Sequence, residues 1–429
     1  MNDVPLPSPT AGQPWLAASI VAGLFLLAAM PLVLTNYNSG QVYYDNQNLF
    51  HLKAVKTFSE QLPHPDLTDY ASATTPLYHL ILASIDRWVS DDMRVSRTVN
   101  ALFAVGFLAT LAAAIARENS VRTTVALCLP LVGSWYIFGP ALWLEPGNAG
   151  WWGVTVVLII AMRPAAGFAS NLIGVVVLLL LALTRQNHLW AASLLWLAAW
   201  LDSSGDAVSM RIRRTAAMVL ATLPSFMAVA WFVMVWHGTV PPTFQKAHTG
   251  GNAAIPATIL SIFGIMGMFF LPLILPTLRQ KWKGSTGLFL IGGGIGLIVG
   301  ILPHTSFSRE HGRLSGLWNI VARLPTFADR SPLIIALSLL GGALAAVWFV
   351  CLPKRERWIF LTALVAFTVA STPNFFAYHR YYEPFALILL ALMTNRIVAG
   401  EQNGVRRWAI WGPVALAMLL ATVTIQNMR

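Results

Sequence analysis

Three polar residues, Arg185-Gln186-Asn187, stand between two apolar runs of the sequence. The guanidinium group of arginine stays charged, and such a group is costly at a membrane boundary unless it holds a polar partner. The neighbouring amides suit hydrogen bonds to hydroxyl groups. The triplet therefore predicts a polar binding site at a membrane surface, with Arg185, Gln186 and Asn187 as binding residues.

Two carboxylates are candidates for acid–base chemistry. Asp45 follows closely on the first apolar run, so it is expected near the membrane surface, where a carboxylate can take the proton of an acceptor hydroxyl as a general base. The alternative is that Asp45 caps a helix that begins near Asn46 or Asn48. Glu145 is the only acidic residue of its loop, and it is either a second carboxylate of the site or a charge at the membrane interface.

Further arginines are candidates for binding a phosphate. If the stretch after His304 is helical, Arg309 and Arg313 are four residues apart and share a face. Two guanidinium groups on one face suit a phosphate, although a basic surface touching lipid head groups is an equal alternative. Arg380 is expected to reach the same phosphate, and Tyr381 is either part of the site or an interface anchor.

Composition predicts the class of protein. Only 10% of the 429 residues are charged and 56% are hydrophobic, whereas soluble domains carry about 25% charged residues. Lipid admits only helices or closed barrels, and the apolar runs are too long and uniform for barrel strands. We therefore expect an all-α polytopic membrane protein, one domain over residues 1–429, with about 13 spans at 14–35, 98–116, 122–141, 149–162, 167–184, 188–201, 215–236, 254–277, 285–303, 332–352, 357–372, 381–398 and 408–425.

Basic residues between the predicted spans suggest an orientation. Triplets such as Arg211, Arg213 and Arg214 occupy short connectors, which places these connectors and the amino terminus inside. The long loops then lie outside, among them loop one (36–97) and a basic loop (304–331). Pro76–Ile85 is expected as a partly embedded helix of loop one, with a fourteenth span as the alternative, and residues 1–13 as a disordered tail.

The remaining features narrow the partners. The histidines fit no zinc-ligand spacing, so we expect no metal site and no cofactor, although a divalent cation between carboxylate and phosphate stays open. The net charge of +11 favours membrane lipids and phosphate-bearing partners, and we expect no nucleic-acid partner. Cys128 and Cys351 are expected as buried core residues.

Four short segments resemble one known family. The chain resembles the GT-C glycosyltransferases, and within them the family of the dolichyl-phosphate-glucose-dependent α-1,2-glucosyltransferase. The order and relative positions of the segments agree along nearly the whole chain. Asn46 stands where the family has a second acidic residue, and the spacing from Asp45 to His51 is wider than in the family. The matching segments are Tyr43-Tyr44-Asp45-Asn46 with Phe50-His51, Thr74-Thr75-Pro76-Leu77-Tyr78, Arg185-Gln186-Asn187, and Arg380-Tyr381-Tyr382-Glu383-Pro384.

The resemblance implies a GT-C-like fold and an inverting glycosyltransferase. It would move a hexose from a polyprenyl-phosphate sugar to a hydroxyl of a lipid-linked or surface glycan. Asp45 would be the base, and the arginines would hold the donor phosphate. The few large soluble loops favour the bacterial inner membrane, with the site on the periplasmic face. A flippase for a lipid-linked saccharide, which needs no base, is the alternative. The implied substrate-binding residues are Tyr44, His51, Glu145, Arg185, Gln186, Asn187, Arg309, Arg313, Arg380 and Tyr381.

Overall fold

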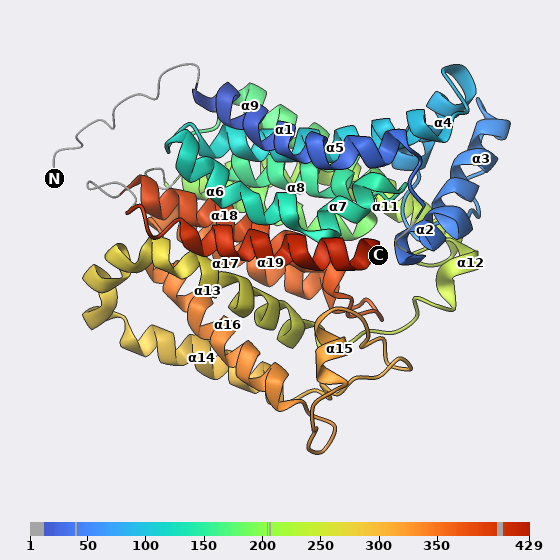
Figure 1. Cartoon of the computed structure of the whole chain (residues 1–429). Helices are drawn as coiled ribbons and strands as arrows, with labels where there is room; N and C mark the ends of the chain where they lie inside the picture. The colour runs from blue at the N-terminus through green and yellow to red at the C-terminus, as the bar shows by residue number, and fades with distance from the viewer. Residues whose placement is uncertain (1–12, 39–40, 204, 206, 401–405) are drawn as a thin grey trace.

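The computed structural model of the chain describes residues 13–38, 41–203, 205, 207–400 and 406–429. Over these residues the chain forms helices and two isolated β-bridges, with no extended strand (Figure 1). The predicted tail at 1–13 lies outside the described residues except for Gln13. The helices are α1 (Gln13–Leu34), α2 (Gln41–Asn46), α3 (Leu52–Gln61), α4 (Leu77–Trp88), α5 (Met93–Ile115), α6 (Val121–Gly133), α7 (Trp135–Leu142), α8 (Gly147–Met162), α9 (Phe168–Thr184), α10 (Ala192–Asp202), α11 (Val208–Trp236), α12 (Pro242–Gln245), α13 (Ile255–Lys281), α14 (Thr286–Ile301), α15 (Leu317–Val321), α16 (Pro332–Cys351), α17 (Lys354–Ser371), α18 (Glu383–Ala399) and α19 (Trp411–Met428).

The long helices make the chain a multi-pass membrane protein. Among the described residues, seven helices are long and apolar enough to cross a membrane, or up to eight if α6 and α7 form one bent span. Each of the 13 predicted spans is largely helical, but several of these helices are shorter than a full crossing, such as α8, α9 and α14. The prediction of an all-helical membrane protein is therefore confirmed, whereas the number of crossings stays a prediction.

One predicted span is broken. The segment predicted at 122–141 forms α6 and α7, which meet at an angle of 62°. Ser134 stands at the break, and its hydroxyl accepts a hydrogen bond from the backbone N–H of Tyr136, at 3.2 Å. A capping serine starts a new helix where the old one ends, so the break is built into the sequence. It turns α7 toward the connector that carries Glu145.

Small residues set the closest helix contacts. α16 packs against both α13 and α14. A Cβ atom added to Gly341 would collide with the backbone carbonyl of Leu260, and one added to Gly292 would lie 2.5 Å from the carbonyl oxygen of Gly342. Glycine therefore lets these backbones touch, as in tightly packed membrane helices. Cys128 and Cys351 are both buried, as expected.

The two ends of the bundle differ. α1 and α19 finish side by side, because the Tyr37 hydroxyl donates a hydrogen bond to the backbone carbonyl of Met428. The described chain therefore starts at one end of the bundle and finishes at the other (Figure 1). Loop one (36–97) contributes α2, α3 and α4, which gather with α12 at the end where α19 finishes. The helix expected at Pro76–Ile85 is confirmed as α4.

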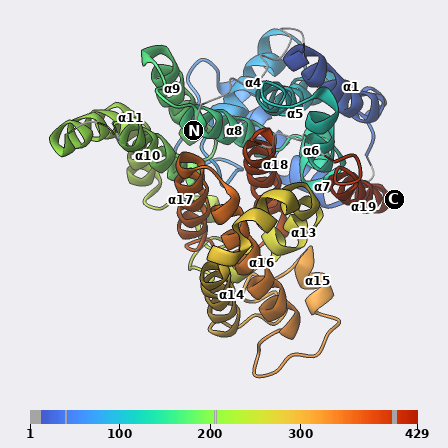
Figure 2. The same ribbon diagram turned by 90° about the vertical axis from the view of Figure 1, so that its left-hand side faces the viewer.

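α11 lies at the edge of the molecule. It packs on α9 and α10, and Figure 2 shows it at the periphery beside α10. Apolar side chains such as Leu220, Met227 and Met234 are exposed along it. A lipid-facing helix has this apolar outer surface, because hydrocarbon is its solvent.

Candidate functional site

Two adjoining cavities are lined in part by residues of loop one. Cavity 1, of about 290 Å³, and cavity 2, of about 320 Å³, share part of their lining. Cavity 1 is lined by side chains of α2, by the connector before α8 and by the segment before α18. Cavity 2 extends between α11 and α17. The residues that line both are Ala73, Thr74, Trp151, Arg185, His248 and Tyr381.

The family-like segments meet in cavity 1. Residues from all four of them line it, although they are separated by up to several hundred residues in the sequence. The resemblance was drawn from four separate stretches of sequence, and the fold brings these stretches to one place. The contributing residues are Tyr43, Asn46, Phe50 and His51 from the first segment, Thr74 from the second, Arg185 from the third, and Arg380 and Tyr381 from the fourth.

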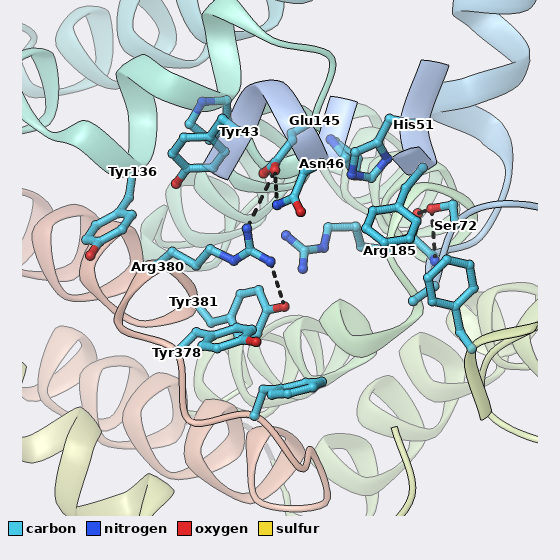
Figure 3. Close-up of a pocket in the computed structure, with 18 of the residues that line it drawn as sticks. Tyr43, Asn46, His51, Ser72, Tyr136, Glu145, Arg185, Tyr378, Arg380 and Tyr381 are labelled. Carbon is cyan, nitrogen blue, oxygen red and sulfur yellow. Dashed lines mark hydrogen bonds and ion pairs between the residues drawn. The ribbon is translucent and has the colours of Figure 1, made fainter. Parts of the chain in front are cut away.

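Glu145 is the carboxylate of cavity 1 (Figure 3). It lies in the short connector between α7 and α8 and is buried. Its Oε1 accepts a hydrogen bond from Asn46 Nδ2 at 3.0 Å and lies 3.5 Å from Arg380 Nη1. Its Oε2 has no hydrogen-bond partner among the described residues. One oxygen is therefore fixed by protein groups, and the other is available to a ligand.

Buried polar side chains hold this connector in place. Asn100 Nδ2 donates to the backbone carbonyls of Pro140, Ala141 and Trp143, at 2.7, 3.1 and 2.9 Å. Gln47 Oε1 accepts a hydrogen bond from the backbone N–H of Leu144, at 3.3 Å. Because the connector is satisfied by buried partners, Glu145 is held in a fixed position.

Two guanidinium groups face one tyrosine ring in the cavity. The guanidinium carbon of Arg380 lies 5.2 Å from the Tyr381 ring centroid and 5.1 Å from that of Tyr378. The guanidinium carbon of Arg185 lies 5.6 Å from the Tyr381 centroid. Aromatic rings attract cations through their faces. Figure 3 shows Arg185 and Arg380 directed toward each other in the centre of the cavity.

Arg185 differs from Arg380 in having no acidic partner. Arg380 forms an ion pair with Glu145, whereas Arg185 makes no ion pair with any described residue, and its buried Nε has no hydrogen-bond partner. Burial lowers the pKa of Arg185 from its ordinary value, but arginine remains charged in proteins. Among the described residues that line the cavity, the positive charges therefore exceed the negative charges by one.

Burial favours the neutral form of the two histidines that line cavity 1. It lowers the pKa of His51, helped by His79 and the two arginines, and it lowers the pKa of His248, helped by Arg380. Burial raises the pKa values of Tyr43 and Tyr378. A charged imidazole or phenolate is disfavoured where water is excluded. The charges of the cavity lining are therefore those of Arg185, Arg380 and Glu145.

Gln186 and Asn187 lie on the side of cavity 2. Gln186 Nε2 donates to the carbonyls of Ala73 and Thr239, both at 3.0 Å, and its Oε1 accepts from Thr75 N–H at 3.0 Å. These bonds tie α9 to loop one, so Gln186 is engaged by the protein. Asn187 is exposed. Their predicted contact with sugar hydroxyls stays a prediction.

Asp45 lies outside both cavity linings. It is exposed on α2, whereas Tyr43 and Asn46, which are three residues apart and share a helix face, line cavity 1. Asp45 does not act as a helix cap, because it lies within α2 and no side chain caps the following η1 (Gln47–His51). Tyr44 is half-buried and also absent from the lining. This placement does not test whether Asp45 is the base, and the variant Asp45→Asn tests that prediction.

The segment of Arg309 and Arg313 is not helical, so the condition for the two arginines to share a helix face is not met. Residues 308–313 form a tight turn closed by backbone pairing of Ser308 with Arg313, so the two arginines do not share a helix face. Gly312 adopts a φ of +65°, which favours a turn. Arg313 Nε donates to the carbonyl of Ser306, at 2.6 Å, and Arg309 is exposed. Neither arginine lines cavity 1 or cavity 2.

Several lining residues were not predicted from the sequence. Asn46 was noted only as a departure from the family pattern, yet its amide donates a hydrogen bond to Glu145. His188 is buried, neither of its ring nitrogens has a hydrogen-bond partner among the described residues, and it lines cavity 2. Helical periodicity was the available signal for Tyr43 and Asn46, since positions three apart share a face. The π-helical turn η1 changes this periodicity before Phe50. Within the described ranges, no three His, Cys, Asp or Glu side chains gather as metal ligands.

Comparisons with known proteins add one solved structure. No protein-family model matches the chain, and no curated protein matches it in sequence. The crystal structure of ArnT from Cupriavidus metallidurans in the apo state is similar over 89% of this chain and 78% of that chain. The two share 14% sequence identity, with a TM-score of 0.38.

Proposed function

We propose that this chain is an inverting GT-C glycosyltransferase that transfers a hexose from a polyprenyl-phosphate sugar to an acceptor hydroxyl. The observation that carries the proposal is the charge of cavity 1: two arginines and one carboxylate, with neutral histidines. The convergence of the four family-like segments on this cavity supports the same function. The donor would be used at the periplasmic face of a bacterial inner membrane.

The charges balance at each stage of the proposed reaction. Before transfer, Arg185, Arg380 and Glu145 sum to +1, which matches the single negative charge of a polyprenyl-phosphate sugar, a phosphodiester. After transfer, the leaving polyprenyl phosphate is a monoester with a charge near −2. If Glu145 has taken the acceptor proton, the three residues then sum to +2. Fixed charges that match the developing charge stabilise the transition state without reorganisation.

The proposed step is a single displacement. The acceptor oxygen attacks the anomeric carbon from the face opposite the phosphate, a new C–O bond forms, and the bond from carbon to phosphate oxygen breaks. The electron pair of that bond leaves with the polyprenyl phosphate. The acceptor proton goes to Oε2 of Glu145, the oxygen that has no hydrogen-bond partner among the described residues. A positioned base of this kind contributes about 10² to 10⁴ in rate.

Cavity 2 is the proposed side for the donor lipid. Its lining combines Arg185 with apolar side chains of two helices, Val229 and Val233 of α11 and Phe367 of α17. An amphiphile would lay its chain against the apolar walls and its phosphate near Arg185. Arg185 and Tyr381 line both cavities, so a phosphate held there would stand between the lipid and the sugar.

The test is a transfer assay with the purified full-length chain. Radiolabelled undecaprenyl-phosphate hexoses are offered to the wild type, Glu145→Gln and Asp45→Asn, with an extract of lipid-linked and surface glycans as acceptors. We expect transfer by the wild type and by Asp45→Asn, and a loss of about 10² or more with Glu145→Gln. Loss of transfer with Asp45→Asn, but not with Glu145→Gln, would identify Asp45 as the base. If the chain moves the lipids across vesicle membranes without transferring any sugar, the result would contradict the glycosyltransferase proposal and support a flippase.

A further inference from the structure

A pair of histidines closes one wall of cavity 1. His51 lines the cavity, and its Nδ1 lies 2.9 Å from Nε2 of His79 on α4. The two rings are nearly parallel, at 14°, with centroids 5.2 Å apart. His79 is completely buried. One hydrogen atom must lie between the two facing nitrogens, because two lone pairs would repel each other at this distance.

The helix geometry explains why His51 reaches the cavity. Residues Gln47–His51 form a π-helical turn, in which the backbone N–H of Leu52 bonds to the carbonyl of Gln47. Such a turn encloses one residue more than an α-helical turn, and π turns occur often at functional sites. Asn46 and His51 therefore both line the cavity although they are five residues apart. This wider turn lies between Asp45 and His51, where the chain has more residues than the family it resembles.

The buried end of the pair sets the position of the hydrogen. Nδ1 of His79 is buried and has no hydrogen-bond partner in the part of the chain that the structure describes. Among buried backbone groups, an N–H without an acceptor is rarer than a carbonyl oxygen with an unused lone pair. The same preference in the imidazole leaves Nδ1 of His79 without a hydrogen. His79 is neutral, because burial lowers its pKa to about 3. Its hydrogen is therefore on Nε2 and is donated to Nδ1 of His51.

This arrangement determines what His51 offers to a ligand. With Nδ1 accepting from His79 and the ring neutral, His51 carries its own hydrogen on Nε2, the nitrogen left for the cavity. We propose that His79 fixes His51 as a neutral Nε2–H donor, and that this donor binds an uncharged oxygen, a hydroxyl or ring oxygen, of the transferred sugar. The proposal rests on the proposed glycosyltransferase function and adds a sugar-recognising residue to it.

An uncharged oxygen fits the surroundings of His51 better than the phosphate does. Asn46 lies beside His51 in the cavity wall (Figure 3). Its amide and the imidazole N–H are both neutral hydrogen-bonding groups, of the kind that select hydroxyl positions. The charged groups that act on His51 are Arg380 and Arg185, which disfavour an imidazolium, and the titratable rings around His79 are Tyr70 and Tyr78. The donor phosphate is already assigned to the two arginines in the proposed function, so His51 is not needed to bind it.

The first experiment measures the tautomers directly and needs no substrate. Histidine-¹⁵N-labelled protein in lipid is examined by solid-state NMR between pH 5 and 8, with His51→Gln and His79→Gln to assign the two residues. We expect both rings to be neutral, protonated at Nε2 and unchanged over this range. An imidazolium at either position, or a His51 protonated at Nδ1, would overturn the proposal even if the enzyme transfers sugar normally.

The second experiment measures sugar selection. The wild type, His51→Gln, which keeps an N–H donor, and His51→Leu, which does not, are compared on a donor sugar and its monodeoxy analogues. We expect one deoxy position that the wild type and His51→Gln reject and that His51→Leu accepts at least tenfold more readily, measured by kcat/KM. His79→Leu should resemble His51→Leu, and the exposed His64→Gln is the control. Equal discrimination in all variants would overturn the role in selection, whereas absence of transfer in the wild type would refute the proposed function instead.

Discussion

Arg185 and Arg380 place their guanidinium groups near one aromatic ring, that of Tyr381, with guanidinium carbons 5.6 and 5.2 Å from its centroid. Only Arg380 is balanced by a carboxylate, that of Glu145, among the residues the structure describes. Two like charges at one ring repel each other. An anion bound between the two guanidinium groups would offset this repulsion. The proposed donor phosphate is such an anion.

Removing either guanidinium should slow transfer strongly. Arg185→Gln and Arg380→Gln each remove a charge that faces the leaving phosphate, and loss of one such donor costs about 10² to 10³ in kcat. Lysine keeps the charge but not the planar fork, so Arg185→Lys should recover part of the rate. The measurement is kcat with a saturating donor.

Arg309→Gln is the matched control for these arginines. Arg309 is exposed and lines neither cavity, so we expect its kcat to match that of the wild type. A loss with Arg309→Gln as large as with Arg185→Gln would instead support the expectation from sequence that the 304–331 loop holds the phosphate.

Asn46 should act through Glu145. Its amide fixes Oε1 of the carboxylate at 3.0 Å, and a hydrogen bond to a charged group is worth about 1.5–3 kcal/mol. Asn46→Ala should therefore lower kcat by about tenfold to a hundredfold, since about 1.4 kcal/mol corresponds to a factor of ten. Asn48 is exposed in the π-helical turn η1 that follows α2, and Asn48→Ala is the control variant. Equal kcat values for the two variants would contradict the role given to Asn46.

Much of the fold followed from hydrophobicity, whereas the site followed only in part. Long apolar runs predicted the helices because the bilayer requires helical backbone. Arg185, at the end of α9, and Arg380, before α18, were predicted as site residues because a charge at a membrane boundary is costly unless it has a polar partner. Glu145 was found as a lone acid, but its contacts with Asn46 and Arg380 join distant parts of the chain, and no local pattern contains them.

Local geometry decided the remaining differences. Asp45 was predicted as the base from its position after the first span. The turn of α2 places it outside the lining of the cavity that Tyr43 and Asn46 line, which does not test its role. Arg309 and Arg313 would share a face only in a helix, whereas Gly312 with its positive φ favours a tight turn. Both differences arise within a few residues, at the level of helix phase and turn type, which hydrophobicity does not record.

Gln186 should contribute mainly to stability. Its three hydrogen bonds connect the end of α9 with residues 73–75 and with Thr239. Gln186→Leu leaves the backbone N–H of the buried Thr75 without its partner, at a cost of about 1–3 kcal/mol, whereas the exposed carbonyl of Thr239 can bond to water instead. The thermal unfolding midpoint in detergent should therefore fall by several degrees. Asn187→Leu changes the adjacent, exposed amide and should leave the midpoint nearly unchanged. A fall in both variants alike would contradict a specific tie.

Acidification should destabilise the protein through His79. The unfolded chain binds a proton near the ordinary histidine pKa of about 6.5, whereas burial lowers the pKa of His79 in the folded protein to about 3. Between these values the unfolded state binds more protons, so the free energy of unfolding falls as the pH falls, by up to about 1.4 kcal/mol per pH unit. The contribution is complete above pH 6.5, and His51 acts in the same direction. Unfolding midpoints of the wild type, His79→Gln and the exposed-site control His64→Gln between pH 4 and 7 measure it. We expect a shallower dependence only for His79→Gln, and three parallel curves would exclude a neutral, buried His79.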